Sequence, residues 1–443
     1  MKRYTSLIAL IFLLCFSFPA YAEYSIKDNY GKILKKLESI RGLKFKKSVP
    51  YSIKTKDQLR KLLVSMFKEE LPPAKFRQFN LTLKTFGLIP ADFDTWNFLI
   101  KVYTEQVAGL YDYKTRSMLL VTGNTSPSGS TAAQAESLRA MGVNIEDMFL
   151  IHEMQHAIQD QYFDISGLLK NVKSSHNDDF EVAVQSLFEG DASLVMLIYM
   201  LDTVGGGMVS MDMIDLSQMR DQFSGATFAA DTEEFSKAPL VFKRTMLFPY
   251  TEGIIFVSQL KKKGGWALVN KAFRKLPHST EQIMDFNKYL SSEMPVIVRF
   301  KRMPDTIGTW KIVDKNTAGE FMTGVIFENF LPDSDFRSLA SGWGGDRYHI
   351  YSSGNKTFLV WYTTWDTNRD AFEFMRAYLK LLSIKYPGIT AVKKSPDKAY
   401  LFRTGKNYAY LAISGSDVLV LEKIPPELIQ KLIKDAWAVS KVK

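Results

Sequence analysis

The sequence predicts an α+β fold, in which a small sheet packed with helices precedes a small C-terminal α+β domain. Three observations support this. Helical periodicity of apolar residues prevails up to about residue 294, strand-like runs interleaved with helices prevail from 295, and a helical His/Glu motif lies in the first part. We therefore expect residues 23–294 to form one domain with an N-terminal α+β segment, and residues 295–443 to form a second domain.

The composition is that of an ordinary globular protein. With 46% hydrophobic and 23% charged residues in 443, a wholly disordered, collagen-like or coiled-coil chain is excluded. The single cysteine excludes an intramolecular disulfide framework, a Cys-based zinc finger and an iron–sulfur cluster. The net charge of +10 is spread without a basic stripe. We expect weak association with anionic cell-envelope components and no binding of nucleic acid.

The first 22 residues have the pattern of a signal peptide. Lys2 and Arg3 form a positive start, residues 7–18 form an apolar run, and residues 19–22 match an A-x-A cleavage site. The apolar run is too short to span a bilayer comfortably. We expect an exported protein, periplasmic or secreted, whose mature chain starts at Glu23 and has no stable transmembrane segment.

Local signals place the elements around the motif. Short apolar runs at 107–110 and 117–121 predict a β-hairpin, and residues 124–133 predict a loop. Asn144 is placed to cap the helix that carries the motif. Further helices are expected after the capping box Thr55…Gln58, at about 179–200, from about Tyr250 to Gly264-Gly265, after Ser279…Gln282, and at 370–384 and 426–439. Strands are expected at 347–352, 357–363, 399–403, 408–413 and 417–421.

The motif is His152-Glu153-Met154-Gln155-His156, an HExxH sequence on a predicted helix. Residues four apart lie on one helical face, so both imidazoles can bind one Zn²⁺. Glu153 is one position further round the helix, where its carboxylate reaches a zinc-bound water and serves as its general base. The apolar flanks of the motif make the histidines half-buried, which favours a metal site over two ordinary surface histidines.

A catalytic zinc needs a third protein ligand. Asp160 lies too far along the same straight helix to complete a tetrahedron. Glu181 and Glu189 share a face of the next predicted helix, and small residues around Glu189 let two helices approach closely, so Glu189 is the preferred ligand. Asp191 is either a partner for the free nitrogen of a ligating histidine or a simple turn residue.

Residues 152–161 followed by Glu189-Gly190-Asp191-Ala192 resemble the gluzincin class of zinc metallopeptidases. More closely, the chain is similar to a largely uncharacterised group of bacterial secreted metallopeptidase-like proteins, whose other marks stand here at 106–112, 249–253, 279–283 and 342–348. The resemblance implies a zincin-like catalytic domain. It also implies that His152, His156 and Glu189 bind zinc, that Glu153 is the base, and that the hairpin supplies an edge strand for an extended peptide substrate.

Two features depart from familiar gluzincins. The gap of 32 residues between His156 and Glu189 is longer than in thermolysin and leaves room for an inserted segment at about 167–178. The residue that stabilises the transition state cannot be placed by motif, and Tyr250 and His278 are the candidates. Residues 342–348 are expected to play a structural part, as a glycine-rich turn in which Asp346 and Arg347 are paired.

The function predicted from the sequence is an exported zinc metallopeptidase, a hydrolase that acts on protein or peptide substrates. Two alternatives remain open: a zinc-stabilised binding or assembly protein of the cell envelope with an inert site, and a zinc hydrolase of a non-peptide amide, such as a cell-wall bond. The intact Glu153 favours an enzyme.

Overall fold

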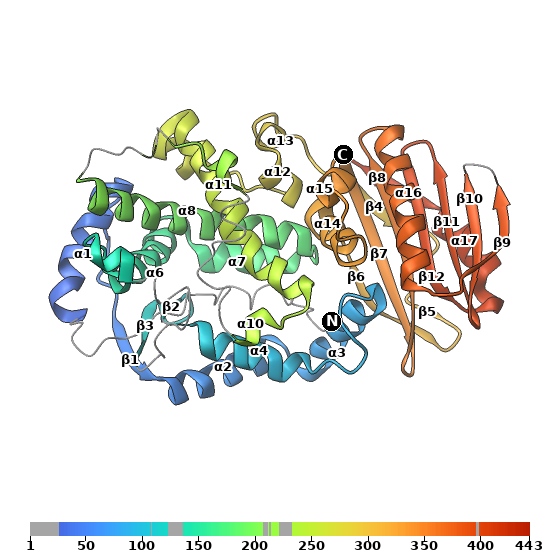
Figure 1. Ribbon diagram of the computed structural model, residues 1–443, viewed down its shortest axis with the longest axis horizontal. Coiled ribbons are helices and arrows are strands. Elements are labelled where there is room, and N and C mark those ends of the chain that lie inside the picture. Colours follow the sequence, from blue (N-terminus) through green and yellow to red (C-terminus); the bar gives the residue numbers. More distant parts are fainter. Residues whose placement is uncertain are drawn as a thin grey trace.

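A computed structural model describes residues 26–107, 109–122, 136–206, 211, 214–220, 233–395 and 398–443. The expected signal peptide and the expected loop at 124–133 lie outside the described residues. Figure 1 shows a helical part and a strand-rich C-terminal part side by side along the long axis. At this level the fold is α+β, as predicted.

Helices dominate the chain up to residue 290. They are α1 (Ile26–Arg41), α2 (Lys56–Glu70), α3 (Pro73–Phe86), α4 (Thr95–Gln106), α6 (Ile145–Phe163), α7 (Ile165–Ser174), α8 (Asp178–Gly205), η3 (Leu216–Met219), α10 (Glu233–Ser236), α11 (Leu240–Ala272), α12 (Thr280–Met284) and α13 (Phe286–Leu290). The predicted caps at Thr55, Asn144 and Ser279 are confirmed, because each side chain accepts a hydrogen bond from a backbone N–H of the helix it precedes. The short helix α7 occupies the segment expected between His156 and Glu189.

A small three-stranded sheet lies beside α6. The predicted hairpin is confirmed as β2 (Gly109–Asp112) and β3 (Ser117–Thr122), which pair antiparallel. A strand that was not predicted, β1 (Tyr51–Thr55), pairs parallel with β3. The strand order β1-β3-β2 leaves β2 at the edge of the sheet, next to the motif helix.

The C-terminal part is built on an eight-stranded sheet of order β5-β6-β7-β8-β12-β11-β10-β9. Its strands are β5 (Thr306–Ile307), β6 (Trp310–Asn316), β7 (Trp343–Ser353), β8 (Lys356–Trp365), β9 (Thr390–Ser395), β10 (Ala399–Thr404), β11 (Asn407–Ser414) and β12 (Asp417–Ile424). The other elements are β4 (Ile297–Phe300), α14 (Gly319–Phe330), α15 (Phe336–Ala340), α16 (Asn368–Lys385), η4 (Pro426–Leu428), α17 (Ile429–Ala436) and β13 (Val439–Val442). All five predicted strands are present, whereas the Lys-containing strands β6 and β9 lack a clear alternating pattern and were missed.

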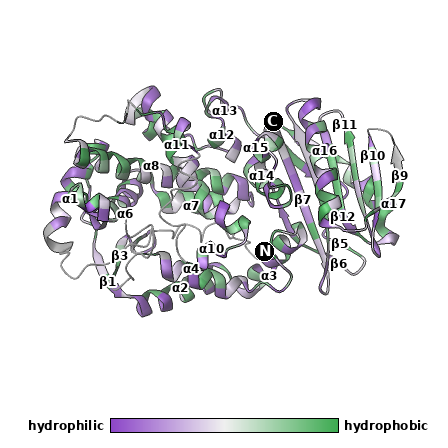
Figure 2. Cartoon of the chain, viewed as in Figure 1, coloured by the Kyte–Doolittle hydropathy of each residue, from purple (hydrophilic) through white to green (hydrophobic). Residues whose placement is uncertain are grey.

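Alternate residues of the central strands face two different cores. Leu359 and Trp361 of β8 join the main core, which also contains α3, α14 and α16 and most of the helical part. Phe358 and Val360 join a smaller core beneath α17 and β4. In Figure 2 the hydrophobic positions run along the strands of this sheet and along α8. The main core therefore continues across residues 294 and 295, and the domain boundary that we expect there stays a prediction.

The prediction for α11 was wrong at its start. The helix begins at Leu240 instead of near Tyr250, and Pro249 lies inside it. Burial of apolar residues on both sides, among them Phe242 and Phe256, outweighs the cost of a proline in the helix. The expected end is correct in its geometry, because the backbone leaves the helical conformation at Gly264 and Gly265.

The helices α8 and α11 cross with their backbones in contact. A Cβ added to Gly190 would lie 2.1 Å from the carbonyl oxygen of Gly253, and one added to Gly253 would lie 2.2 Å from that of Ser186. Only glycine permits this approach at both positions. The close crossing expected from the small residues around Glu189 is thus present, and it brings Tyr250 of α11 near the metal-site helices.

Among the described residues, α8 is long and apolar enough to meet a length-and-composition test for a membrane-spanning helix. Of its most apolar window, 83% is buried inside the protein. The same properties are found in the core helix of a soluble protein.

Candidate metal centre

The structure brings His152, His156 and Glu189 into one buried cluster. The two histidines lie one turn apart on α6, and Glu189 reaches them from α8. The Nε2 atoms of His152 and His156 are 3.2 Å apart, and Oε2 of Glu189 is 3.3 Å and 3.5 Å from them. All three side chains are almost completely buried.

The spacing of these three atoms fits a tetrahedral zinc. Ligand atoms that each lie about 2.0–2.1 Å from a tetrahedral ion are about 3.3–3.4 Å from one another. The three observed distances of 3.2, 3.3 and 3.5 Å match that triangle. Two imidazoles and a carboxylate are also the donor types that zinc takes in catalytic sites with one position left for water.

The charges of the cluster are coupled. Burial disfavours the charged form of His156, but the carboxylate of Glu189 outweighs burial and raises the pKa of His156 to about 9. Burial likewise opposes ionisation of Glu189, and the two histidines outweigh it and lower the pKa of Glu189 to about 2. Both shifts favour the charged forms of the two groups, and a metal ion bound by them would take the place of the proton on His156.

A buried chain of hydrogen bonds orients His156. Its Nδ1 lies 3.0 Å from Oε1 of Gln159, and Nε2 of Gln159 donates to Oδ2 of Asp191 at 3.0 Å. Nε of Arg41, on α1, donates to the other oxygen of Asp191 at 3.0 Å. This arrangement keeps Nε2 of His156 directed at the cluster, and the histidines of known metal sites are commonly oriented by such hydrogen bonds to their second ring nitrogen.

The expectation for Asp191 needs one correction. Asp191 supports the site through Gln159 rather than by holding a histidine directly, and it also accepts from Nε2 of Gln155 at 2.5 Å. Gln159 was missed from the sequence, although it lies three residues after His156 on the same helical face. Arg41 carried no sequence signal, because it lies 150 residues from Asp191.

Glu153 points from α6 toward the edge strand β2. Its Oε2 accepts the backbone N–H of Tyr111 at 2.7 Å, so the side of β2 that faces away from β3 faces the motif helix. Cγ of Glu153 would lie 3.9 Å from a Cβ on Gly109. The base candidate and the edge strand are therefore adjacent, which is the arrangement that the resemblance implies for a strand-like substrate.

Two tyrosines lie beside the cluster. The ring of Tyr250, the predicted catalytic tyrosine, stacks on His152 with centroids 6.2 Å apart. Tyr113, in the turn of the hairpin, meets His156 edge-on at 6.2 Å, and its buried hydroxyl has no hydrogen-bond partner in the structure. Burial and the carboxylates of Glu189 and Glu153 raise the pKa of Tyr113 well above its usual value, so the phenol stays protonated. The sequence analysis did not single out Tyr113.

The other candidates lie elsewhere. His278 stacks on Phe180, nine residues before Glu189 on α8. Asp160 accepts the hydroxyl of Tyr111 at 3.2 Å and is not part of the cluster, and neither is Glu181. The preference for Glu189 over both carboxylates agrees with the geometry.

Only Gly342 lies in a turn, with φ of 78°, and residues 343–348 form the start of β7, so the expected glycine-rich turn was wrong over most of the segment. Asp346 accepts the backbone N–H groups of Ala318 and Gly319 at 2.9 and 2.8 Å. It also accepts the indole N–H groups of Trp343 and Trp361 at 2.9 and 3.1 Å, instead of pairing closely with Arg347. The structural role assigned to the segment fits these contacts.

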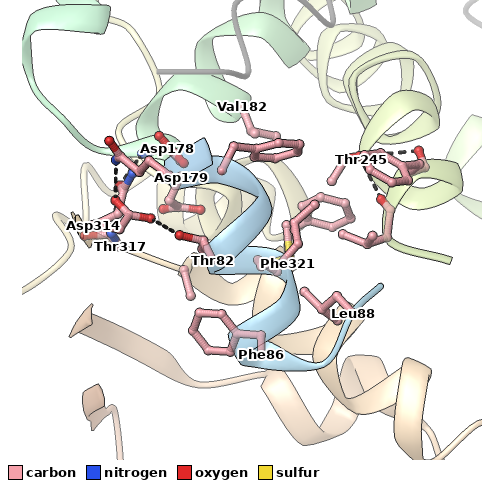
Figure 3. Close-up of a pocket in the computed structure, with 18 of the residues that line it drawn as sticks. Thr82, Phe86, Leu88, Asp178, Asp179, Val182, Thr245, Asp314, Thr317 and Phe321 are labelled. Atoms are coloured by element: carbon pink, nitrogen blue, oxygen red, sulfur yellow. Dashed lines mark hydrogen bonds between the residues drawn. The ribbon is translucent and has the colours of Figure 1, made fainter. Parts of the chain in front are cut away.

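A separate pocket of about 130 Å³ lies between α3, α8, α11 and the sheet (Figure 3). Thr82, Asp178, Asp179 and Asp314 gather at one end of it, and most of the remaining lining is apolar, with Thr245 among the polar exceptions. None of the three cluster residues lines this pocket. It is therefore distinct from the metal centre.

Comparison with known proteins matches only the C-terminal part. Residues 308–432 match the family model of a domain of unknown function (DUF8575). This range covers most of the eight-stranded sheet and excludes the metal centre. No curated protein and no solved structure matches the chain.

Proposed function

We propose that the protein is an exported zinc-dependent peptidase of the gluzincin type, with a zincin-like catalytic part, that acts on proteins or peptides. The observation that carries this proposal is the triangle of His152, His156 and Glu189, whose edges fit a zinc ion, with Glu153 beside it. The support of His156 through Gln159 and Asp191 is the kind of outer arrangement that metal ligands require.

His152, His156 and Glu189 would hold the metal, and zinc, when bound, polarises a carbonyl group and makes its water acidic. Glu153 would act as general base for the attacking water and would later donate the proton to the leaving amine. The edge of β2 aligns an extended substrate beside Glu153. The buried O–H of Tyr113 is the donor for the developing oxyanion, with Tyr250 as the second candidate.

Wild type and Glu153→Gln separate this proposal from its alternatives. Both are expected to contain one zinc per chain, and only wild type cleaves casein or a peptide library. General acid–base catalysis contributes about 10²–10⁴-fold, so cleavage by Glu153→Gln should fall by that factor. Glu146→Gln, in the first turn of the same helix, is the matched control and should keep wild-type activity.

The other outcomes point to the alternatives. Zinc in both proteins without cleavage of any peptide contradicts a peptidase. Cleavage of cell-wall fragments alone favours the hydrolase of a non-peptide amide. A folded wild type without zinc removes the basis of the whole assignment.

A further inference from the structure

Gln185 on α8 is a buried amide whose hydrogen-bonding groups are unused. Its side chain is 0% exposed, and neither Oε1 nor Nε2 has a hydrogen-bond partner in the structure. Buried polar side chains are nearly always paired, and an unpaired one is destabilising. An unpaired amide in the core therefore lowers the stability of the free protein, and a ligand that pairs with it would recover that loss.

Its position connects it to the metal centre. Gln185 precedes Glu189 by four residues, so the two side chains share one face of α8, about 6 Å apart along the axis. An extended peptide advances about 3.3 Å per residue, which places Gln185 level with a residue one or two positions from the bond at the metal. Glu189 and His152 are likewise almost completely buried, at 1% and 2% exposed, so low exposure shields Gln185 from a substrate no more than it shields the candidate metal ligands.

The chemistry of the side chain identifies its partner. A primary amide is neutral and offers an acceptor and two donors, which matches the C=O and N–H of a peptide main chain and gives no advantage to a charged group. Gln159 is the contrast within the same protein, because both its Oε1 and its Nε2 are engaged by His156, Phe188 and Asp191. Gln159 holds the site together, whereas the amide of Gln185 has no hydrogen-bond partner among the residues that the structure describes.

We propose that Gln185 binds a main-chain amide of the substrate, one or two residues from the scissile bond. This rests on the proposed peptidase function. The proposed role of Gln185 gives α8 a second function besides supplying Glu189. It also requires a substrate that is an extended chain with peptide groups on at least one side of the bond that is cut.

The first test is the stability of the zinc-free full chain. Gln185→Met removes an unpaired polar group at similar volume, so its melting temperature should rise by about 1–3 °C. Thr323→Val is the matched control, since Thr323 on α14 is also 0% exposed with an unpartnered hydroxyl, and it should give a similar rise. Gln159→Met, which loses used hydrogen bonds, should lower the melting temperature.

The second test is binding to the zinc-loaded protein without turnover. Acetohydroxamate tests access to the metal alone. Two longer peptide hydroxamates each carry two additional residues, one compound before the metal-binding group and the other after it. Gln185→Met should bind acetohydroxamate like wild type and bind one of the two longer hydroxamates about three- to tenfold more weakly. Thr323→Val should bind all three like wild type.

The two proposals fail in different ways. If wild type binds the hydroxamates and cleaves peptides, but Gln185→Met binds all three probes equally well, the role of Gln185 is overturned and the peptidase stands. A lower melting temperature for Gln185→Met also overturns it, because the amide then has a partner in the folded chain. If acetohydroxamate does not bind zinc-loaded wild type, the peptidase and the role of Gln185 both fall.

Discussion

Glu189 on α8 and Asp346 on β7 are both almost completely buried, at 1% and 2% exposed, but their oxygens are used differently. Asp346 accepts four N–H groups, two from the start of α14 and two from indole rings. Glu189 has no hydrogen bond to its oxygens and faces two imidazoles at ion-pair distance. Burial of a carboxylate alone therefore does not mark a functional site, whereas burial with unused oxygens beside other ligand atoms does.

The largest effect expected from this contrast is the loss of metal in Glu189→Ala. Removal of one of three protein ligands should lower zinc content from one per chain to near zero, and zinc affinity by more than the ~100-fold typical of changes behind the ligands. Competition with a chelator measures the affinity. Retention of full zinc content by Glu189→Ala would show that another group completes the site.

Asp346→Ala should lower the stability of the protein and leave its zinc content unchanged, which is the opposite of the effect expected for Glu189→Ala. It leaves four buried N–H donors unpaired, so the free energy of unfolding should fall by about 3–5 kcal/mol, while the folded protein keeps its zinc. Denaturant titration and zinc analysis measure the two quantities. Glu373→Ala, at an exposed ion pair on α16, is the control and should change stability by less than about 1 kcal/mol. Zinc loss in folded Asp346→Ala would contradict the contrast.

Gln159→Met tests the support behind the metal ligands. It removes the hydrogen bond that orients His156, so zinc affinity should fall by about 10–100-fold with the ligands themselves intact. Chelator competition against wild type measures this loss. An unchanged affinity would mean that packing alone fixes the ring of His156.

The last expected effect depends on pH and concerns Asp179, another buried carboxylate with one unused oxygen. Burial raises its pKa from 3.8 to about 8, against the hydrogen bonds from Thr280. Because the folded pKa lies above the unfolded one, the favourable contribution of the protonated group is complete below about pH 4 and is lost as the pH rises to about 8.

Asp179→Asn keeps an acceptor for Thr280 and cannot ionise. In the zinc-free state it should be more stable than wild type at pH 8, and the difference should shrink as the pH falls toward 4. Melting temperatures of both proteins across this range measure the effect. Parallel pH profiles would show that Asp179 does not titrate in this window.

Local patterns predicted much of the candidate site. His152, His156 and Glu189 follow from helical spacing within two segments, and the caps and the hairpin follow from a few neighbouring residues. What the sequence could not predict depends on long-range contacts. The pairing of Arg41 with Asp191 joins residues 150 apart, and the start of α11 is decided by burial around Pro249.

The central claim is that His152, His156 and Glu189 form a zinc centre. X-ray absorption at the zinc edge of the purified full chain, with zinc per chain measured on the same sample, tests it most directly. The account predicts one zinc per chain with four nitrogen or oxygen ligands at about 2.0–2.1 Å, two of them imidazoles, and loss of this signal in Glu189→Ala. A folded wild type that contains no zinc, or a zinc signal that Glu189→Ala leaves unchanged, would contradict it.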